Sequence, residues 1–309
     1  MAASEVNADV MSDLSHYGLI EAKGEDARKF LAGLFTGDVR IVSPEKGLFT
    51  AWCDAKGRAQ ATFWLMMHGD AFYVVLPKEV LEPTLAGLKR YLLRVKLTLG
   101  DASDSMARLG LSGPGIAAKL TELLGAPPPE EINATRTYGG CTLMAIPGAS
   151  GPRWLVLGEA GAVAELKQSL GATPVDEDTW RLLDILADIP LLVTETAGEF
   201  VPQMLNMEAL GGLCFNKGCY PGQEVIARLH YRGQLKRQLF RATLYSDTLP
   251  KPGDKLHGEG QAESVGIVVS AIRHPDGPVT LLAVLKIEEK ALGPVRLGDA
   301  QGPQLAFVE

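Results

Sequence analysis

One short segment of the chain, residues 216–224, carries the side chains best suited to chemistry. It places Cys219 two residues after Lys217 and between Gly218 and Gly222, which predicts a tight loop leading into a short helix. The positive end of that helix and the Lys217 ammonium both favour a thiolate over a thiol, so Cys219 is a candidate nucleophile. The competing interpretation is a small, half-buried residue in a loop whose glycines serve the backbone.

Other candidate residues lie close to this cysteine. Tyr220, Gln223 and Glu224 complete the segment as supporting residues, and a basic group follows at Arg228, Arg232, Lys236 and Arg237. Cys214 and Cys219 form a C-x4-C pair, but neither a second pair nor a histidine at ligand spacing accompanies them. Two unrelated thiols are therefore the favoured interpretation, and no metal site is predicted.

The elements that must hold this segment have the pattern of an α+β protein. Apolar runs and turn signals predict a strand, a helix, three further strands and a second helix, at residues 17–22, 24–34, 48–53, 59–67, 71–76 and 77–93. A similar order follows, with strands at 107–111, 140–146 and 154–158 and with helices at 116–124 and 161–170. The repetition predicts two related modules of the ferredoxin-like, split βαβ type.

The last part of the chain has a different character. From residue 240 onwards, short apolar runs alternate with proline and glycine turns, which predicts a small β-barrel. We therefore expect a first, discontinuous α+β module of residues 1–50 and 135–237, a second module of residues 51–134, and the barrel at residues 238–309. A helix at 178–187 carries Trp180, which by composition alone is a core residue.

Composition limits the classes of function. The 309 residues are 46% hydrophobic and carry a net charge of −7, which argues against a module that grips nucleic acid. The sequence has no run of apolar residues long enough to span a membrane, and its four cysteines are too few and too scattered to form a disulfide framework. We expect a cytoplasmic protein that binds neither nucleic acid nor membrane directly.

The segment K-G-C-Y-P-G-Q-E at residues 217–224 matches the signature K-G-C-Y-x-G-Q-E of the YgfZ family. The resemblance extends to the hairpin at residues 53–57 and to further positions of the second half, namely 189–190, 200–203, 206, 210–212, 232–233 and 236–237. The chain thus resembles a YgfZ-type folate-binding protein, a relative of the glycine-cleavage T-protein (GcvT) that has lost the methyltransferase chemistry.

This resemblance implies a fold and a function. YgfZ proteins have three domains arranged in a ring, like the T-protein, around a central cavity that binds tetrahydrofolate. They support the assembly or repair of iron-sulfur clusters in client enzymes, including tRNA-modifying ones. The cofactor is thus expected to be tetrahydrofolate or a derivative, and the partners a reduced folate and iron-sulfur client or assembly proteins.

The resemblance also assigns roles to residues. The family's function is thought to depend on a cysteine at the position of Cys219. Folate contacts in a relative come from two tryptophans, which Trp180 and Tyr17 match in position; the tyrosine keeps an aromatic face but a smaller one. The basic group Arg228, Arg232, Lys236 and Arg237 then has three interpretations, as a contact for a folate polyglutamate tail, as a contact for an acidic client surface, or as a solvated helix face.

Two other functions compete with this one. A folate-dependent aminomethyltransferase needs a carboxylate beside the folate, but alignment on Lys56 and Gly57 places Ala61 and Thr62 there, and neither side chain moves a proton usefully at neutral pH. A ligand-free scaffold or regulatory protein is the third possibility, and it predicts no folate binding and no effect of changing Cys219. A classical enzyme is not expected.

Overall fold

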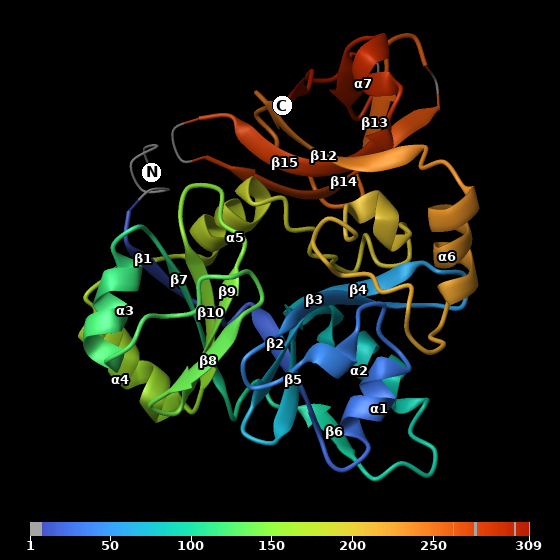
Figure 1. Ribbon diagram of the computed structural model, residues 1–309. Coiled ribbons are helices and arrows are strands. Elements are labelled where there is room, and N and C mark those ends of the chain that lie inside the picture. Colours follow the sequence, from blue (N-terminus) through green and yellow to red (C-terminus); the bar gives the residue numbers. More distant parts are fainter. Residues whose placement is uncertain (1–7, 262, 275–276, 300, 309) are drawn as a thin grey trace.

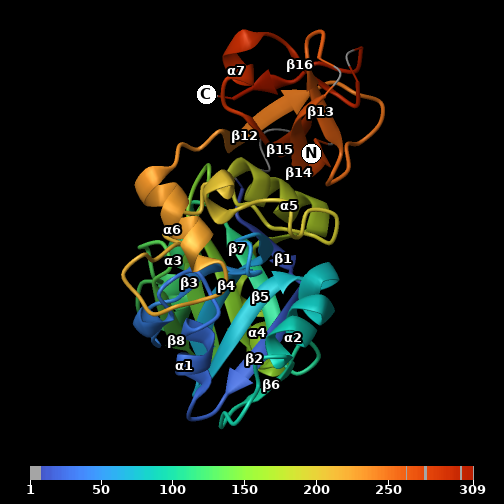
Figure 2. The same ribbon diagram turned by 90° about the vertical axis from the view of Figure 1, so that its right-hand side faces the viewer.

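The computed structural model describes residues 8–261, 263–274, 277–299 and 301–308, and it contains three sheets with helices packed around them (Figures 1 and 2). The expected mixture of α and β structure is confirmed. Among these residues no helix is both long enough and apolar enough to cross a membrane.

The first sheet is antiparallel and is formed by residues 17–101. Its strands lie in the order β3-β4-β5-β2-β6, and two helices belong to the same stretch of chain. In chain order the elements are β2 (Tyr17–Lys23), α1 (Ala27–Ala32), β3 (Leu48–Cys53), β4 (Ala59–His68), β5 (Ala71–Pro77), α2 (Leu81–Lys89) and β6 (Thr98–Asp101). Every β5 residue is buried, as expected for a central strand of a packed sheet.

The second sheet repeats this path with one strand added. Its order is β11-β1-β7-β10-β9-β8, and β1 (Val10–Asp13) lies between β7 and β11. In the first sheet, β2 and β6 occupy the places of β7 and β11, and they pair directly with each other. The remaining elements are β7 (Ala107–Ser112), α3 (Ile116–Leu124), β8 (Thr135–Tyr138), β9 (Cys141–Ile146), β10 (Arg153–Gly158), α4 (Ala160–Leu170) and β11 (Thr173–Val175).

The strand pairings divide the chain differently from the expected module boundaries. Residues 17–50 pair with residues 51–101 and not with 135–237, because β2 runs alongside β5 over its full length, from Tyr17 opposite Pro77 to Lys23 opposite Ala71. Residues 107–134 belong with 135–175 in the second sheet. The N-terminal strand that does reach the second sheet is β1, whose short apolar pattern lies among acidic residues and was not predicted.

The third sheet begins at Arg237 and curls across the top of the molecule in Figure 1. Its order is β16-β13-β14-β15-β12-β17, with antiparallel neighbours. The elements are β12 (Arg237–Leu244), β13 (Lys255–Gly258), β14 (Ser264–Arg273), β15 (Val279–Lys286), α7 (Glu289–Leu292), β16 (Val295–Leu297) and β17 (Ala306–Phe307).

The segment between the second and third sheets joins all three. Helix α5 (Glu177–Leu186) begins at Asp176, whose side chain accepts a hydrogen bond from the Thr179 amide, and it packs against β14 and β15. The 3-10 helix η3 (Pro202–Leu205) and α6 (Gln223–Arg232) follow. One buried apolar cluster contains side chains from every sheet, including Leu19, Leu155 and Val284, so the site elements share a rigid core.

Candidate functional site

The loop that carries the motif, residues 216–222, packs onto the turn between β3 and β4. Gly222 has a φ of +78°, and a Cβ atom built there would lie 2.4 Å from the Gly57 Cα atom. Gly57 also has a positive φ, of +73°, and the Asp54 side chain shapes its turn by accepting hydrogen bonds from the amides of Lys56 and Arg58. The two segments that resemble the YgfZ family therefore meet backbone to backbone.

Gly218 differs from Gly222. A Cβ atom at Gly218 would meet nothing within 4 Å, and its φ is not positive. The expectation that both glycines serve the backbone is therefore supported at Gly222 only.

Lys217 fastens the loop to α1. Its ammonium donates hydrogen bonds to the carbonyl oxygens of Ala32, at 2.9 Å, and of Phe35, and it lies 4.5 Å from the centre of the Tyr220 ring. These contacts satisfy carbonyl groups at the end of the helix. Burial lowers the pKa of Lys217 to about 8. The side chain thus has a clear structural role beside the expected electrostatic one.

Cys219 lies at the surface. It is the one exposed cysteine of the four; Cys214 is half-buried, and Cys53 and Cys141 are buried, which raises the pKa of both. The neighbouring Tyr220 is buried, and its hydroxyl has no hydrogen-bond partner. No cluster of three or more histidine, cysteine or acidic side chains able to hold a metal occurs in the described part of the chain. Cys219 is thus the cysteine most accessible to solvent.

Tyr17 and Trp180 are connected through a buried ion pair. The Tyr17 hydroxyl donates to Asp184, and an Asp184 oxygen lies 2.7 Å from a guanidinium nitrogen of Arg153. That guanidinium lies 4.2 Å from the Trp180 ring, and Gly110 packs so closely on the ring that a Cβ there would approach three ring carbons within 2.5–2.7 Å. Burial, then the Asp184 charge, raises the pKa of Tyr17. The Trp180 ring is thus packed against Arg153 and Gly110 of the protein itself.

A cavity of about 220 Å³ lies beside Tyr17, and we call it the Tyr17 cavity. Its walls come from the start of β2, from α5 and the segment after it, and from β14 with the loop before β13. Most of its lining is apolar, as at Ile185, Leu191 and Val269. Residues 216–224 do not line it, so the cavity and Cys219 are separate features of the molecule.

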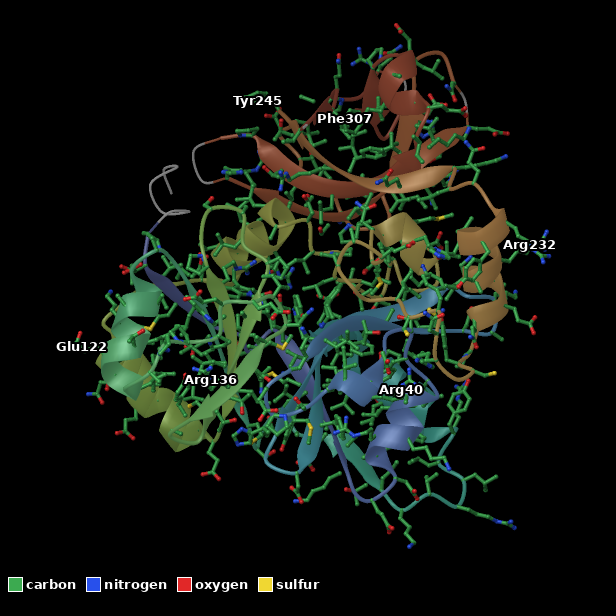
Figure 3. The ribbon with its side chains drawn as sticks, viewed as in Figure 1. Arg40, Glu122, Arg136, Arg232, Tyr245 and Phe307 are labelled. Carbon is green, nitrogen blue, oxygen red and sulfur yellow. The ribbon has the colours of Figure 1, made fainter. Side chains whose placement is uncertain are left out.

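The basic group lies on and after α6, at the edge of the molecule. Arg228, Arg232 and Lys236 are exposed, and Figure 3 shows Arg232 directed away from the body of the protein. Arg237 is half-buried and donates to the Val265 carbonyl. Lys236 and Arg237, together with Lys286, line a second hollow of about 540 Å³ between the end of α6 and the third sheet. The basic group contributes nothing to the Tyr17 cavity.

The other motif residues belong to the first turn of α6. Gln223 is half-buried and Glu224 is exposed, and an acidic side chain in this turn complements the positive end of the helix.

Thr62, at the position where an aminomethyltransferase would carry its acid, has a structural role. Its hydroxyl donates to the Pro190 carbonyl at 2.6 Å and accepts from the Leu192 amide at 3.0 Å. Thr62 and Ala61 are both fully buried. The Thr62 hydroxyl thus holds the segment after α5 against β4, and neither side chain carries an acid.

Four residues of the cavity region were missed at the level of sequence, namely His16, Arg153, Asp184 and Ser270. Asp184 lies one helical turn after Trp180, and Arg153 begins an otherwise apolar strand, so both had a weak signal. The position of His16 next to Tyr17 was also a weak signal. Ser270 had no signal in the sequence, because its place beside the cavity depends on a bulge in β14.

Comparisons with known proteins find relatives of this chain in both sequence and fold. The family model of the GCVT N-terminal domain matches residues 4–136. The tRNA-modifying protein YgfZ of Cronobacter sakazakii is 30% identical over 96% of this chain and 90% of its own length, and that of Escherichia coli O157:H7 is 33% identical over 88% and 84%. The crystal structure of the glycine cleavage system aminomethyltransferase T from Bartonella henselae has the same fold, with a TM-score of 0.72 over 98% of this chain and 85% of that one, at 15% identity.

Proposed function

Since the chain belongs to the YgfZ family of tRNA-modifying proteins, we propose that it binds tetrahydrofolate or a derivative and supports iron-sulfur cluster assembly or repair in client enzymes, including tRNA-modifying ones. The three sheets would act as three domains around the folate. The observation that carries the proposal is the Tyr17 cavity, an apolar pocket beside a buried aromatic side chain.

The size and lining of the cavity support a folate ring as its occupant. Ligand pockets are mostly apolar with a few placed polar groups, and about 220 Å³ suits a bicyclic ring better than a whole folate. The rest of the molecule would lie at the mouth, where Lys251 and Arg181 are both exposed and Arg181 is paired with Glu177. A glutamate tail carries the charge that these cations complement.

Cys219 is the proposed point of action on a client. Its exposed thiol stands on a loop that Lys217 and the contact between Gly222 and Gly57 hold in place. The exposed basic residues of α6 follow this loop in the chain and lie outside the Tyr17 cavity. Of the expected roles for the basic group, contact with an acidic client surface therefore has better support than contact with a folate tail.

A calorimetric titration with tetrahydrofolate tests the ligand. We expect binding to the unaltered protein and a loss of tenfold or more in affinity, about 1.4 kcal/mol, in Tyr17→Ala. Arg232→Ala, which changes a residue far from the cavity in the fold, is the control and should bind as the unaltered protein does. A chain that binds no folate at all would favour the ligand-free scaffold instead.

A complementation assay tests the thiol separately. We expect Cys219→Ser to lose the ability to restore an iron-sulfur tRNA-modifying enzyme in cells while its thermal unfolding stays unchanged, because an exposed loop thiol contributes little packing. Cys214→Ser, five residues earlier, should retain function. Equal restoration by Cys219→Ser and the unaltered protein would remove this residue from the proposal.

A further inference from the structure

The hollow of about 540 Å³ between the end of α6 and the third sheet collects positive charge that the chain itself does not neutralise. Its lining contains three cations and one acidic side chain, namely Lys236, Arg237, Lys286 and Glu288. Within the described part of the chain, none of the three cations forms an ion pair, and their one side-chain hydrogen bond runs from Arg237 to the Val265 carbonyl. The hollow therefore has an excess of positive charge.

Two of these cations face each other across a pair of strands. Arg237, the first residue of β12, lies directly opposite Lys286, the last residue of β15. Opposite residues of an antiparallel pair share a face of the sheet, with Cβ atoms about 4.5–5.5 Å apart, and like charges there destabilise the pair. Lys236 is held beside them, because its carbonyl accepts a hydrogen bond from the Ile287 amide at 3.0 Å. An anion between the cations would remove this repulsion, so the hollow fits a negatively charged ligand.

An exposed aromatic ring lies near the hollow. Tyr231, in the last turn of α6, is 64% exposed and precedes the lining residue Gln234 by three positions, so their Cα atoms lie within about 11 Å. The rings of Phe215 and His230 stack at 3.9 Å, and Tyr231 meets them edge-on at 6.0 and 4.7 Å. His230 in turn lies 3.1 Å from a carboxylate oxygen of Glu208. The Tyr231 ring is thus supported from within while most of its surface is open to solvent.

We infer that the hollow and the Tyr231 ring together bind single-stranded RNA, with phosphates among the three cations and an unpaired base on the ring. This inference rests on the proposed function, because client enzymes that modify tRNA bring RNA to the protein. It adds a nucleic-acid contact that the composition of the whole chain did not predict.

The combination of cations with an exposed aromatic ring favours RNA over an acidic peptide. A peptide would neutralise the hollow but has no group that requires Tyr231, whereas every nucleotide of a single strand offers a phosphate and a base that stacks on aromatic rings. The ring favours unpaired bases, since those of a duplex are already stacked on each other. The net charge of −7 opposes contact over a wide surface, so binding depends on these local charges and should weaken steeply with added salt.

Fluorescence anisotropy of a labelled single-stranded oligoadenylate, measured over a series of salt concentrations, tests the phosphate contacts. We expect the double variant Lys236→Gln, Lys286→Gln to bind about tenfold more weakly at low salt. The slope of log affinity against log salt should fall by about 1.4, because each phosphate contact on a single strand contributes about 0.7. The control is Lys29→Gln, Lys89→Gln, which removes the same charge from exposed positions on α1 and α2 and should keep the slope. Equal losses in the two double variants would reduce the effect to net charge and overturn the site.

Tyr231→Leu tests the stacked base in the same assay. We expect a loss of about fivefold or more in affinity at an unchanged salt slope, because the ring carries no charge. Tyr245→Leu changes a tyrosine that is 81% exposed just beyond the opposite end of β12, and it should bind as the unaltered protein does. Unchanged binding by Tyr231→Leu, or displacement of the RNA by oligoglutamate at equal charge concentration, would overturn the RNA site in favour of an acidic peptide.

Titration with tetrahydrofolate separates this inference from the proposed function. Neither Lys236 nor Lys286 lines the Tyr17 cavity, so their double variant should bind tetrahydrofolate as the unaltered protein does. An unaltered protein that binds tetrahydrofolate but not the oligoadenylate would remove the RNA site and leave the proposed function in place. A protein that binds neither would remove both.

Discussion

At the scale of single residues, the buried ion pair of Asp184 and Arg153 determines the environment of both aromatic candidates. Tyr17 donates its hydroxyl to the carboxylate, and the guanidinium lies on the Trp180 ring. A tryptophan at position 17 could not place a hydroxyl there. Tyr17 therefore offers a smaller aromatic face than a tryptophan would, but its hydroxyl forms a hydrogen bond that ties β2 to α5.

Removing the charge of Asp184 should be costly. Asp184→Asn leaves the Arg153 guanidinium buried without an ionic partner, and breaking such a pair costs about 3–5 kcal/mol of the free energy of unfolding. Urea denaturation measures the change. The exposed pair of Asp70 with Lys23 provides the control, since Asp70→Asn should not shift the midpoint measurably. Equal midpoints for the two variants would contradict the structural importance of the buried pair.

His16 should make stability depend on pH in a defined window. The unfolded chain takes up a proton at this residue near pH 6.5, whereas the folded protein does so only near pH 4. The unfolded state thus binds more protons between these values, and the free energy of unfolding falls as the pH is lowered from 6.5 to 4, by up to about 3 kcal/mol from this group. His16→Phe should flatten this part of the profile in urea denaturation series. Parallel profiles for the variant and the unaltered protein would show that His16 does not titrate in this way.

At the scale of elements, the contact between the motif loop and the β3–β4 turn shows what the sequence could predict. The hairpin, the loop and α6 were all expected from turn residues and apolar spacing, and the structure contains them. Their mutual contact was not predictable, because it depends on two glycine backbones that approach across a long stretch of chain. In the same way, the resemblance identified Tyr17 and Trp180 as candidates, but only the structure shows the ion pair of Asp184 and Arg153 that lies between them.

Gly222→Ala should disrupt this contact. The φ of +78° and the 2.4 Å approach to the Gly57 backbone both oppose a methyl group, and together they should lower the free energy of unfolding by about 2 kcal/mol or more. Gly218→Ala, four residues earlier in open space, is the matched control and should have little effect. Hydrogen exchange would locate the damage, with faster exchange expected at the Gly57 turn in the first variant only. Similar stability of the two variants would argue against a close contact.

At the scale of the whole molecule, β1 makes the second sheet depend on the N-terminal end of the chain. It pairs with β7 on one side and with β11 on the other, and Val10 lies in the apolar cluster shared by the three sheets. The sequence predicted a repeated α+β pattern, but it assigned the whole segment 1–50 to the module that contains residues 135–237, whereas only β1 of that segment pairs in the second sheet. The reason is physical, since four residues are too few to display the alternation that identifies a strand.

Val10→Asp should therefore destabilise the entire protein. It places an unpaired carboxylate at a position that is 1% exposed, and we expect a loss of about 3 kcal/mol or more in the free energy of unfolding. Asp13→Ala, at the exposed end of the same strand, should cost about 1 kcal/mol at most. Thermal unfolding followed by circular dichroism distinguishes the two. A small effect of Val10→Asp would mean that the second sheet tolerates the loss of β1.

The position of β1 also constrains how the protein emerges from the ribosome. Val10 is synthesised well before its parallel partner, Thr173, which belongs to the second half of the chain. The first sheet, residues 17–101, can assemble from contiguous chain before the partner strands of β1 have been synthesised. The N-terminal strand is then an unpaired edge exposed to other chains until β7 and β11 arrive. Chaperone binding during synthesis should accordingly concentrate on nascent chains whose last residue lies after the first sheet and before the end of the second sheet in the sequence.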